Sequence, residues 1–342
     1  MILGDKLMIK NFIPILFSIL FIASCNSKKN NLITIEGEAQ GTTWHISYIS
    51  EDRINHKQAI DSILKDIDLS LSTYLPVSII SRINKNEPDV NIDSYFIKVF
   101  NKSMEVSKRT GGIFDVTVGP LVNAWGFGFT KKASIDSARI DSILQYVNYK
   151  MLKLDGNRVI KEMKEIQLDF NAIAQGYSVD ILASYLGKRG IENYLVELGG
   201  ELIAKGKKNN ENWKVGIDQP IQNISSERKL EAIIELDNRA LCTSGNYRKF
   251  YEEDGKRYAH ILDPRTGFPA RQNILSASVL ADDAMTADAY ATVFMVMGLE
   301  QSKEYLVDNK DLNLEVYFIY DEKGLWKTYS SQSLKNRIKQ VN

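Results

Sequence analysis

The chain has 342 residues, with 43 basic and 43 acidic side chains and no formal net charge at neutral pH. Balanced charge without a basic block argues against nucleic acid as a partner. Three histidines and two cysteines are too few for the usual zinc sites, so any bound metal is expected to have oxygen ligands. The length fits one large domain or two closely packed ones.

The first residues are typical of an export signal. Lys6 and Lys10 precede an apolar run over residues 12–23. A membrane-spanning helix needs roughly 20 apolar residues, so this shorter run indicates a signal peptide over residues 1–24. It ends on small residues before Cys25, as at a lipoprotein cleavage site. We expect Cys25 to carry the lipid, including palmitate; the alternative is an ordinary signal followed by an unrelated cysteine.

A polar tether follows over residues 25–31. It has nothing to bury, which suits a link between a lipid and a folded domain over residues 32–342. We therefore expect an exported protein that is anchored by lipid to the cell membrane, preferably the inner membrane, and faces the periplasm. The only other cysteine is Cys242, so the folded domain has no internal disulfide.

Apolar periodicity, turn residues and helix caps predict the elements of the folded domain. Helices are expected over residues 60–71, 94–109, 173–188, 284–297 and 300–307. Strands are expected over residues 34–35, 42–49, 168–170, 194–196, 213–217, 230–236, 314–320 and 326–329. Because helices and strands mix without a regular βαβ alternation, we expect an α+β fold with mixed or antiparallel sheets.

Five segments have compositions that core packing alone does not explain. The first, residues 111–128, is rich in glycine and aromatic residues, which allow a backbone to approach a flat ring and cover it. It lacks the Lys-Ser/Thr ending of a P-loop, and a structural turn is the alternative.

The second and third segments lie at ends of expected strands. In residues 168–177, Asp169 precedes a helix start whose free N–H groups could bind a phosphate. The alternative is that Asp169 or Asn171 simply caps this helix. Residues 197–201 form a tight exit from a strand, and a plain turn is the alternative there.

The fourth segment joins residues 243–248 to the polar turn 260–267. His260 and Asp263 could act on one ligand, because histidine can serve as a base near neutral pH. A structural histidine is the alternative.

The fifth segment, residues 283–292, begins with good helix caps. Asp288 and Thr292 share one helix face, with Ala291 contributing only a methyl group between them. This face could hold Mg²⁺, which prefers oxygen ligands. A buried aspartate hydrogen-bonded to a threonine is the alternative.

Taken together and in this order, the segments resemble the ApbE family of FAD:protein FMN transferases. The likeness runs from Gly-Thr-Thr-Trp at 41–44 to the last helix. It includes Ser-Thr-Tyr at 72–74 and Ser-Arg-Ile-Asn at 81–84. The resemblance implies an α+β fold with FAD in a cleft and a divalent ion at its pyrophosphate.

The resemblance also implies which residues make the site. FAD contacts are expected at Gln40, Tyr74, Ile113, Phe114, Asp115, Asp169, Gln175 and Leu262. The metal ligands are expected to be the carbonyl of Ala172 and the side chains of Asp288 and Thr292. Gln40 stands where many members have methionine, Gln175 where lysine or glutamate is common, and Ala291 where some members have an acidic residue.

The implied reaction is a magnesium-dependent transfer. A threonine or serine hydroxyl of a target protein attacks the FMN phosphorus of FAD and AMP leaves, with His260 and Asp263 as candidates for accepting the proton. The acceptor is expected to be a subunit of a membrane electron-transport complex with a Ser/Thr-Gly-Ala-Thr-like motif. Two alternatives stay open: a magnesium-dependent FAD pyrophosphatase that yields FMN and AMP, and a non-catalytic FAD-binding lipoprotein.

Overall fold

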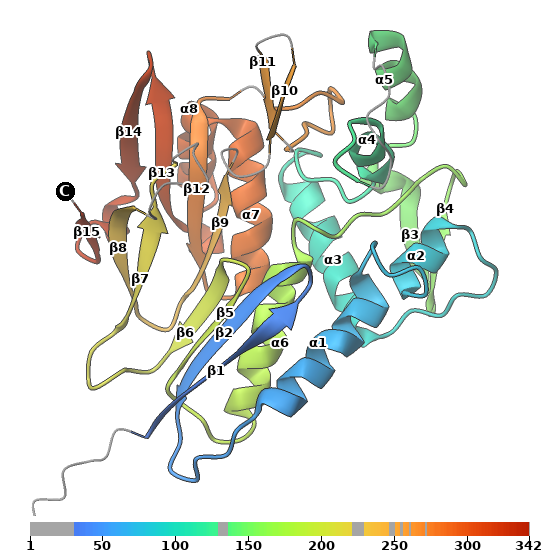
Figure 1. Cartoon of the computed structure of the whole chain (residues 1–342). Helices are drawn as coiled ribbons and strands as arrows, with labels where there is room; N and C mark the ends of the chain where they lie inside the picture. The colour runs from blue at the N-terminus through green and yellow to red at the C-terminus, as the bar shows by residue number, and fades with distance from the viewer. Residues whose placement is uncertain are drawn as a thin grey trace, which may run out of the picture. The chain divides into compact units, whose positions relative to one another are not determined.

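The computed structural model describes residues 31–128, 136–220, 229–245, 250–253, 256–259, 261–270 and 272–341. Cys25, the expected signal peptide and His260 lie outside these residues. Residues 31–342 cluster as one compact unit, in which a large sheet and several helices pack together (Figure 1). Within the described ranges, no helix is long and apolar enough to cross a membrane.

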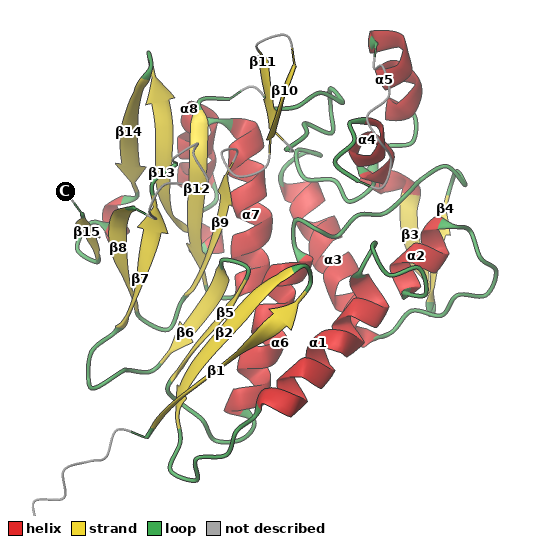
Figure 2. Cartoon of the chain, viewed as in Figure 1, coloured by secondary structure: helices red, strands yellow, loops and turns green. Residues whose placement is uncertain are grey.

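The central sheet has eight antiparallel strands in the order β1-β2-β5-β6-β9-β12-β13-β14 (Figure 2). Its strands are β1 (Leu32–Ala39), β2 (Thr42–Ile49), β5 (Tyr194–Leu198), β6 (Glu201–Lys205), β9 (Ala240–Gly245), β12 (Ile274–Ala281), β13 (Glu315–Glu322) and β14 (Leu325–Ser330). Hairpins join β1 to β2, β5 to β6 and β13 to β14. The observed mixture of helices and antiparallel strands confirms the predicted α+β class.

Smaller sheets and the helices complete the unit. One small sheet has three strands, β7 (Trp213–Asp218), β8 (Leu230–Leu236) and β15 (Ile338–Gln340). Two further sheets have two strands each: β3 (Leu152–Asp155) pairs with β4 (Arg158–Lys161), and β10 (Phe250–Glu253) pairs with β11 (Lys256–Ala259). The α-helices are α1 (Lys57–Leu71), α2 (Ile79–Asn84), α3 (Ser94–Arg109), α4 (Gly119–Ala124), α5 (Ser137–Leu144), α6 (Ala174–Gly187), α7 (Ala284–Met297) and α8 (Leu299–Asp308). Three 3₁₀ turns are η1 (Tyr149–Met151), η2 (Lys310–Leu312) and η3 (Gln332–Leu334).

Helices α6 and α7 pack directly on one face of the central sheet and against each other. Almost every residue of α7 is buried, as expected for a helix that is apolar on all sides. Helix α1 is instead amphipathic: it buries Ile60, Leu64, Ile67 and Leu71 and contacts β1, α2, α3 and α6. The other sheet face is covered by β7, β8 and β15 through a second apolar cluster. Strand β12 is therefore buried on both faces along most of its length.

One predicted strand is wrong. Residues 168–170 belong to no strand, and the preceding Gln167 makes only an isolated bridge, to Val118. The elements that were not predicted are helices α2, α4 and α5 and strands β3, β4, β6, β9, β10, β11, β12 and β15. The apolar run of β12 does not alternate because both of its faces are covered, so period-two patterning does not reveal it.

Candidate functional site

The first halves of helices α6 and α7 meet at Gly176. Its backbone N–H donates to Oδ2 of Asp288 over 2.9 Å. A Cβ atom on residue 176 would lie 2.3 Å from the carbonyl oxygen of Ala284, so glycine is required for this approach. The contact brings Asp288 to the first turn of α6, toward the segment that contains Ala172. Thr292 lies one turn further along α7 and is partly exposed.

Two carboxylates hold the first turn of α7. Asp180, which lies on α6, accepts from the N–H groups of Ala284 at 2.8 Å and Met285 at 2.9 Å. Asp283 is the N-cap, as predicted, and its side chain accepts from the N–H of Thr286 in the first turn of α7. Burial raises the pKa of Asp180 to about 7 against the effect of these two donors. Helix α7 is thus fixed both internally and by α6.

The loop before α6 is fixed by Asn84, the last residue of α2. Its Oδ1 accepts from the N–H of Leu168 at 2.7 Å, and its Nδ2 donates to the carbonyl of the same residue at 2.8 Å. The N–H of Asp169 donates to the carbonyl of Val116 at 2.8 Å. The segment 168–177 therefore contacts the glycine-rich segment and the motif that ends at Asn84, as a shared site requires.

The triplet Ile113, Phe114 and Asp115 is buried. Oδ1 of Asp115 accepts from the N–H and hydroxyl of Thr117 at 2.8 and 2.6 Å, and its Oδ2 accepts from the N–H of Tyr149 at 2.7 Å. Burial raises the pKa of Asp115, and these three donors oppose the rise. The Asp115 carboxylate therefore fixes the loop. Because both of its oxygens are engaged, a flavin contact at residues 113–115 would use backbone groups of the triplet.

No side chain of the preceding loop caps the N-terminus of α6. Its N-cap residue is Ile173, while the Asp169 carboxylate accepts from the backbone N–H of Asn171 at 2.7 Å and its amide at 3.2 Å. The alternative in which Asp169 or Asn171 merely caps this helix is therefore wrong. Burial raises the pKa of Asp169. In the first turn of α6, the N–H of Ala174 donates to the carbonyl of Phe170 and that of Gly176 donates to Asp288. This leaves the N–H of Gln175 as the one in this turn that suits an anion such as a pyrophosphate.

Tyr74 stands on the loop between α1 and α2 and is 62% exposed. Partial burial of the hydroxyl and then the Asp169 carboxylate raise the pKa of Tyr74, so its phenol lies near Asp169. An exposed aromatic ring is suited to stacking on a flat ligand ring.

Gln40 lies in a turn that contacts α6, and Gln175 lies in the first turn of α6 itself. Gln40 has a positive φ of 53° in the turn between β1 and β2, and its Nε2 donates to Oγ of Ser178 at 2.8 Å. The amide of Gln40 thereby ties this hairpin to α6. Gln175 lies against Gly199, where an added Cβ would be 3.1 Å from its Nε2. The segment 197–201 thus joins the same neighbourhood.

The turn over residues 261–267 packs on the glycine-rich segment. Leu262 is buried in a small apolar cluster with Trp125, whose Nε1 donates to the carbonyl of Gly267 at 2.7 Å. The two Asp263 oxygens accept from Nε and Nη2 of Arg265 at 2.9 and 2.8 Å. Asp263 is therefore engaged by Arg265 within the described residues, and its relation to His260 lies outside them.

Asp288 has the environment of an oxygen ligand for a hard cation. It is 7% exposed, and burial raises its pKa to about 7, opposed by the N–H of Gly176. That hydrogen bond engages only Oδ2. With the hydroxyl of Thr292 and the carbonyl of Ala172, the predicted donor set consists of oxygen atoms alone, which suits Mg²⁺.

The predicted set contains a single carboxylate. Across the described part of the chain, no three His, Cys, Asp or Glu side chains come together as a metal site. Mg²⁺ at Asp288 would therefore complete its coordination with water and substrate phosphate oxygens, as is usual for this ion.

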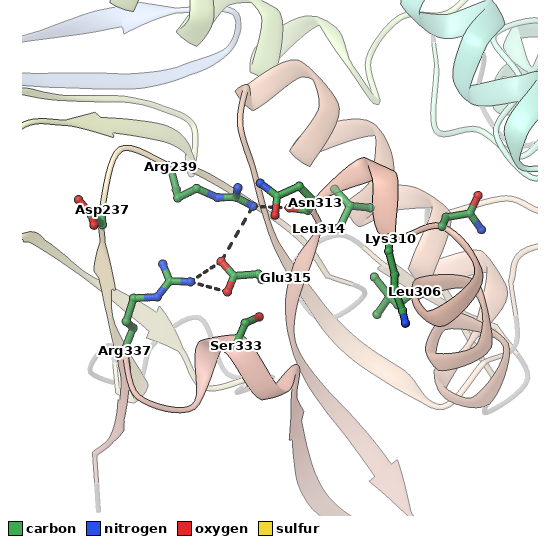
Figure 3. A pocket seen from close by; sticks show the side chains of 10 residues that line it. Asp237, Arg239, Leu306, Lys310, Asn313, Leu314, Glu315, Ser333 and Arg337 are labelled. Atoms are coloured by element: carbon green, nitrogen blue, oxygen red, sulfur yellow. Dashed lines mark hydrogen bonds and ion pairs between the residues drawn. The ribbon is translucent and has the colours of Figure 1, made fainter.

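A pocket of about 430 Å³ lies beside η2 and η3 (Figure 3). Arg337 donates to both oxygens of Glu315, and Arg239 pairs with Glu315 and Asp282. None of the predicted flavin or metal residues lines it. We interpret its ion pairs as a link between β13 and the C-terminal residues.

Two residues of the site were not singled out from the sequence. Asp180 could have been found, because it lies four residues after Gly176 and so shares its helix face. Arg265 gave a weaker signal, since a charged residue in a polar turn is usually solvated.

Comparisons with known proteins identify the family of this chain. The model of the ApbE family matches residues 40–318. An FAD:protein FMN transferase of Haemophilus influenzae is 36% identical over 332 residues, covering 92% of this chain and 94% of its own length. The solved flavin transferase ApbE of Vibrio cholerae has a TM-score of 0.79 at 34% identity, covering 90% of this chain and 99% of that one. The apo flavinyl transferase ApbE of Pseudomonas stutzeri has a TM-score of 0.79 at 30% identity, covering 90% and 96%. The chain belongs to the ApbE family.

Proposed function

We propose that this protein is a magnesium-dependent FAD:protein FMN transferase. It attaches FMN through a phosphoester bond to a threonine or serine of a target protein and releases AMP. Family membership and the names of the relatives support the transfer reaction. The magnesium dependence rests on the donor set at Asp288.

The observation that carries the proposal is the hydrogen bond between Gly176 and Asp288. It joins the first turn of α6 to a buried carboxylate. The helix start suits the negative charge of a pyrophosphate, and the carboxylate suits a divalent cation bound to the same group. The two features together fit a substrate with two linked phosphates, such as FAD.

The flavin half is assigned to the neighbouring loops. Tyr74 offers an exposed ring, while Ile113, Phe114 and Asp115 offer backbone groups in a buried loop. Gln40 and Gln175 border the hairpin turns next to α6. We assign Asp169 and Leu262 to the wall of the site, where they fix the loops that the ligand would contact.

In the proposed reaction, the acceptor oxygen forms a bond to the FMN phosphorus and the bond from that phosphorus to the AMP oxygen breaks. Bound Mg²⁺ would supply charge neutralisation at the pyrophosphate. Asp288, Thr292 and the carbonyl of Ala172 would hold the ion. His260 would accept the proton of the acceptor hydroxyl, and Asp263, which is held by Arg265, would border that position.

The same site would also support hydrolysis if water replaced the acceptor hydroxyl, giving a pyrophosphatase. The names of the relatives favour transfer. We also propose that Cys25 carries the lipid anchor, that the folded domain faces the periplasm, and that the acceptor is a subunit of a membrane electron-transport complex.

The test is to incubate the purified full chain with FAD, Mg²⁺ and a peptide that carries a Ser/Thr-Gly-Ala-Thr motif, and to record intact masses. A gain equal to one FMN residue that EDTA abolishes would support transfer. Free FMN and AMP with an unmodified peptide would support the pyrophosphatase, and unaltered FAD would contradict catalysis.

A further inference from the structure

The contact between α6 and α7 has two parts on one helix face. Gly176 and Asp180 are four residues apart on α6, so they lie one above the other and both face α7. Gly176 contacts Asp288 through its N–H, and Asp180 contacts the N–H groups of Ala284 and Met285. Asp180 thus holds α7 one turn before Asp288.

We propose that Asp180 is a positioning residue of the metal site: its carboxylate fixes the start of α7 on α6 and thereby holds Asp288 opposite the segment that contains Ala172. The inference rests on the proposed function, because it assigns a task toward the metal. Asp180 itself is not proposed as a metal ligand, because both of its oxygens accept from N–H groups of α7.

The position of Asp288 depends on the hydrogen bonds that Asp180 makes. Ala284 and Asp288 are also four residues apart, so one rigid helical turn joins the residue that Asp180 holds to the proposed ligand. The pair of hydrogen bonds, at 2.8 and 2.9 Å, restricts both translation and rotation of this turn. Removing a group that orients a metal ligand without binding the metal commonly weakens metal affinity.

Helix capping alone does not explain Asp180. Asp283 already caps α7, accepting from the N–H of Thr286 at 2.8 Å and from its hydroxyl at 2.9 Å. The bonds of Asp283 stay within α7, whereas those of Asp180 cross from α6. The two aspartates therefore form a matched pair, in which both satisfy N–H groups of one helix turn but only Asp180 joins the two halves of the site.

The experiment compares Asp180→Ala with Asp283→Ala in the full chain. Mn²⁺ replaces Mg²⁺ as a paramagnetic probe, and its affinity is measured by electron paramagnetic resonance with FAD present and no acceptor. Circular dichroism confirms that each variant is folded at the chosen temperature. The Mg²⁺ dependence of FMN transfer is recorded in parallel.

We expect Asp180→Ala to bind Mn²⁺ about 10-fold or more weakly than the wild type, while Asp283→Ala stays within about twofold although both unfold at lower temperature. Transfer by Asp180→Ala should recover in part at saturating Mg²⁺. If Asp180→Ala does not fold, Asp180→Asn, which keeps one acceptor oxygen, should show a smaller loss of affinity in the same direction.

Equal Mn²⁺ affinity in the wild type and in a folded Asp180 variant would overturn the inference. An equal loss in Asp180→Ala and Asp283→Ala would also overturn it, because helix capping would then be sufficient. A wild-type chain that does not bind Mn²⁺ would instead contradict the metal site of the proposed function, and the inference with it. The Mn²⁺ titration of the wild type alone shows whether the metal site itself fails, and the variants then test only the role of Asp180.

Discussion

Asn84 satisfies both backbone polar groups of Leu168, at 2.7 and 2.8 Å. The amide side chain takes the place of a neighbouring strand, which residues 168–170 lack. It thereby fixes the loop that carries Asp169 and leads into α6.

Asn84→Ala should lower the free energy of unfolding by about 1 to 3 kcal/mol, because it leaves a donor and an acceptor of buried Leu168 without their partner. Urea denaturation measures the change. Asn86→Gly is the control, since Asn86 donates only at an exposed position and has a positive φ that glycine adopts easily. An equal effect of both substitutions would contradict the role given to Asn84.

Gly176→Ala should prevent the close approach of α6 and α7. The new methyl group would lie 2.3 Å from the carbonyl oxygen of Ala284, and a backbone atom cannot move aside as a flexible side chain can. We expect a loss of about 1 to 3 kcal/mol in stability together with reduced FMN transfer.

Gly187→Ala provides the matched control for Gly176 on the same helix. A Cβ at Gly187 would meet no atom within 4 Å, so this change should stabilise the chain by up to about 1 kcal/mol through helix propensity. Thermal unfolding of both variants checks the pair. Similar midpoints for the two would show that the helices can separate without cost.

His56 should make stability depend on pH. Burial and then the positive charge of Arg189 lower the pKa of His56, whose ring lies between Tyr48 and Tyr185. Between the folded pKa and the ordinary value of about 6.5, the unfolded chain binds more protons, so stability falls as the pH decreases through this window. The contribution of His56 to the free energy of unfolding is therefore fully present above about pH 6.5.

The His56→Phe variant keeps an aromatic ring between the two tyrosines but cannot titrate. Its free energy of unfolding should therefore change less between pH 7.5 and pH 5 than that of the wild type. Urea denaturation at several pH values measures the difference. Parallel pH profiles for the two proteins would rule out His56 as the origin.

Much of the fold could be predicted from the sequence where one local signal dominates. The helix at Ser94–Arg109 and the strand at Leu230–Leu236 have the predicted bounds, since spacing and terminators agree there. The N-cap Asp283 is also confirmed. Residues 168–170 were predicted as a strand because their composition is strand-like, but their partner is the side chain of Asn84, a tertiary contact that no local pattern shows.

The site was predicted as a set of segments. Contacts in the structure join residues 168–177 to residues 111–128, 197–201 and 283–292, whereas His260 lies outside the described residues. What the sequence could not show is which side chains are already engaged. The Asp115 carboxylate is held by Thr117 and Tyr149, and that of Asp263 by Arg265. Such pairings depend on the path of the chain between distant segments, so composition and spacing do not reveal them.

Asp288→Asn should separate stability from metal binding. The amide oxygen can still accept from Gly176, while the buried charge is removed, so the metal-free variant should be at least as stable as the wild type. With FAD present, Mg²⁺ should raise the unfolding temperature of the wild type and not that of the variant. EDTA should reverse the rise, and a Mg²⁺-dependent rise in Asp288→Asn would exclude this carboxylate as a ligand.

Arg337→Ala should destabilise the chain without changing catalysis. Glu315 is 7% exposed and both of its oxygens accept from Arg337, so removing the guanidinium leaves a buried carboxylate with Ser333 and the more distant Arg239. We expect a loss of about 2 to 4 kcal/mol, less than for a fully buried pair because Arg337 is partly exposed.

The exposed pair of Arg158 and Asp89 is the control for Arg337, and Arg158→Ala should leave the unfolding midpoint unchanged. At a temperature where Arg337→Ala is folded, its rate of FMN transfer should equal that of the wild type, because no predicted site residue lines this pocket. A folded Arg337→Ala variant with impaired transfer would show that the pocket takes part in function. Unchanged transfer with lower stability would confirm that Glu315 and Arg337 serve the fold alone, by holding the C-terminal residues to β13.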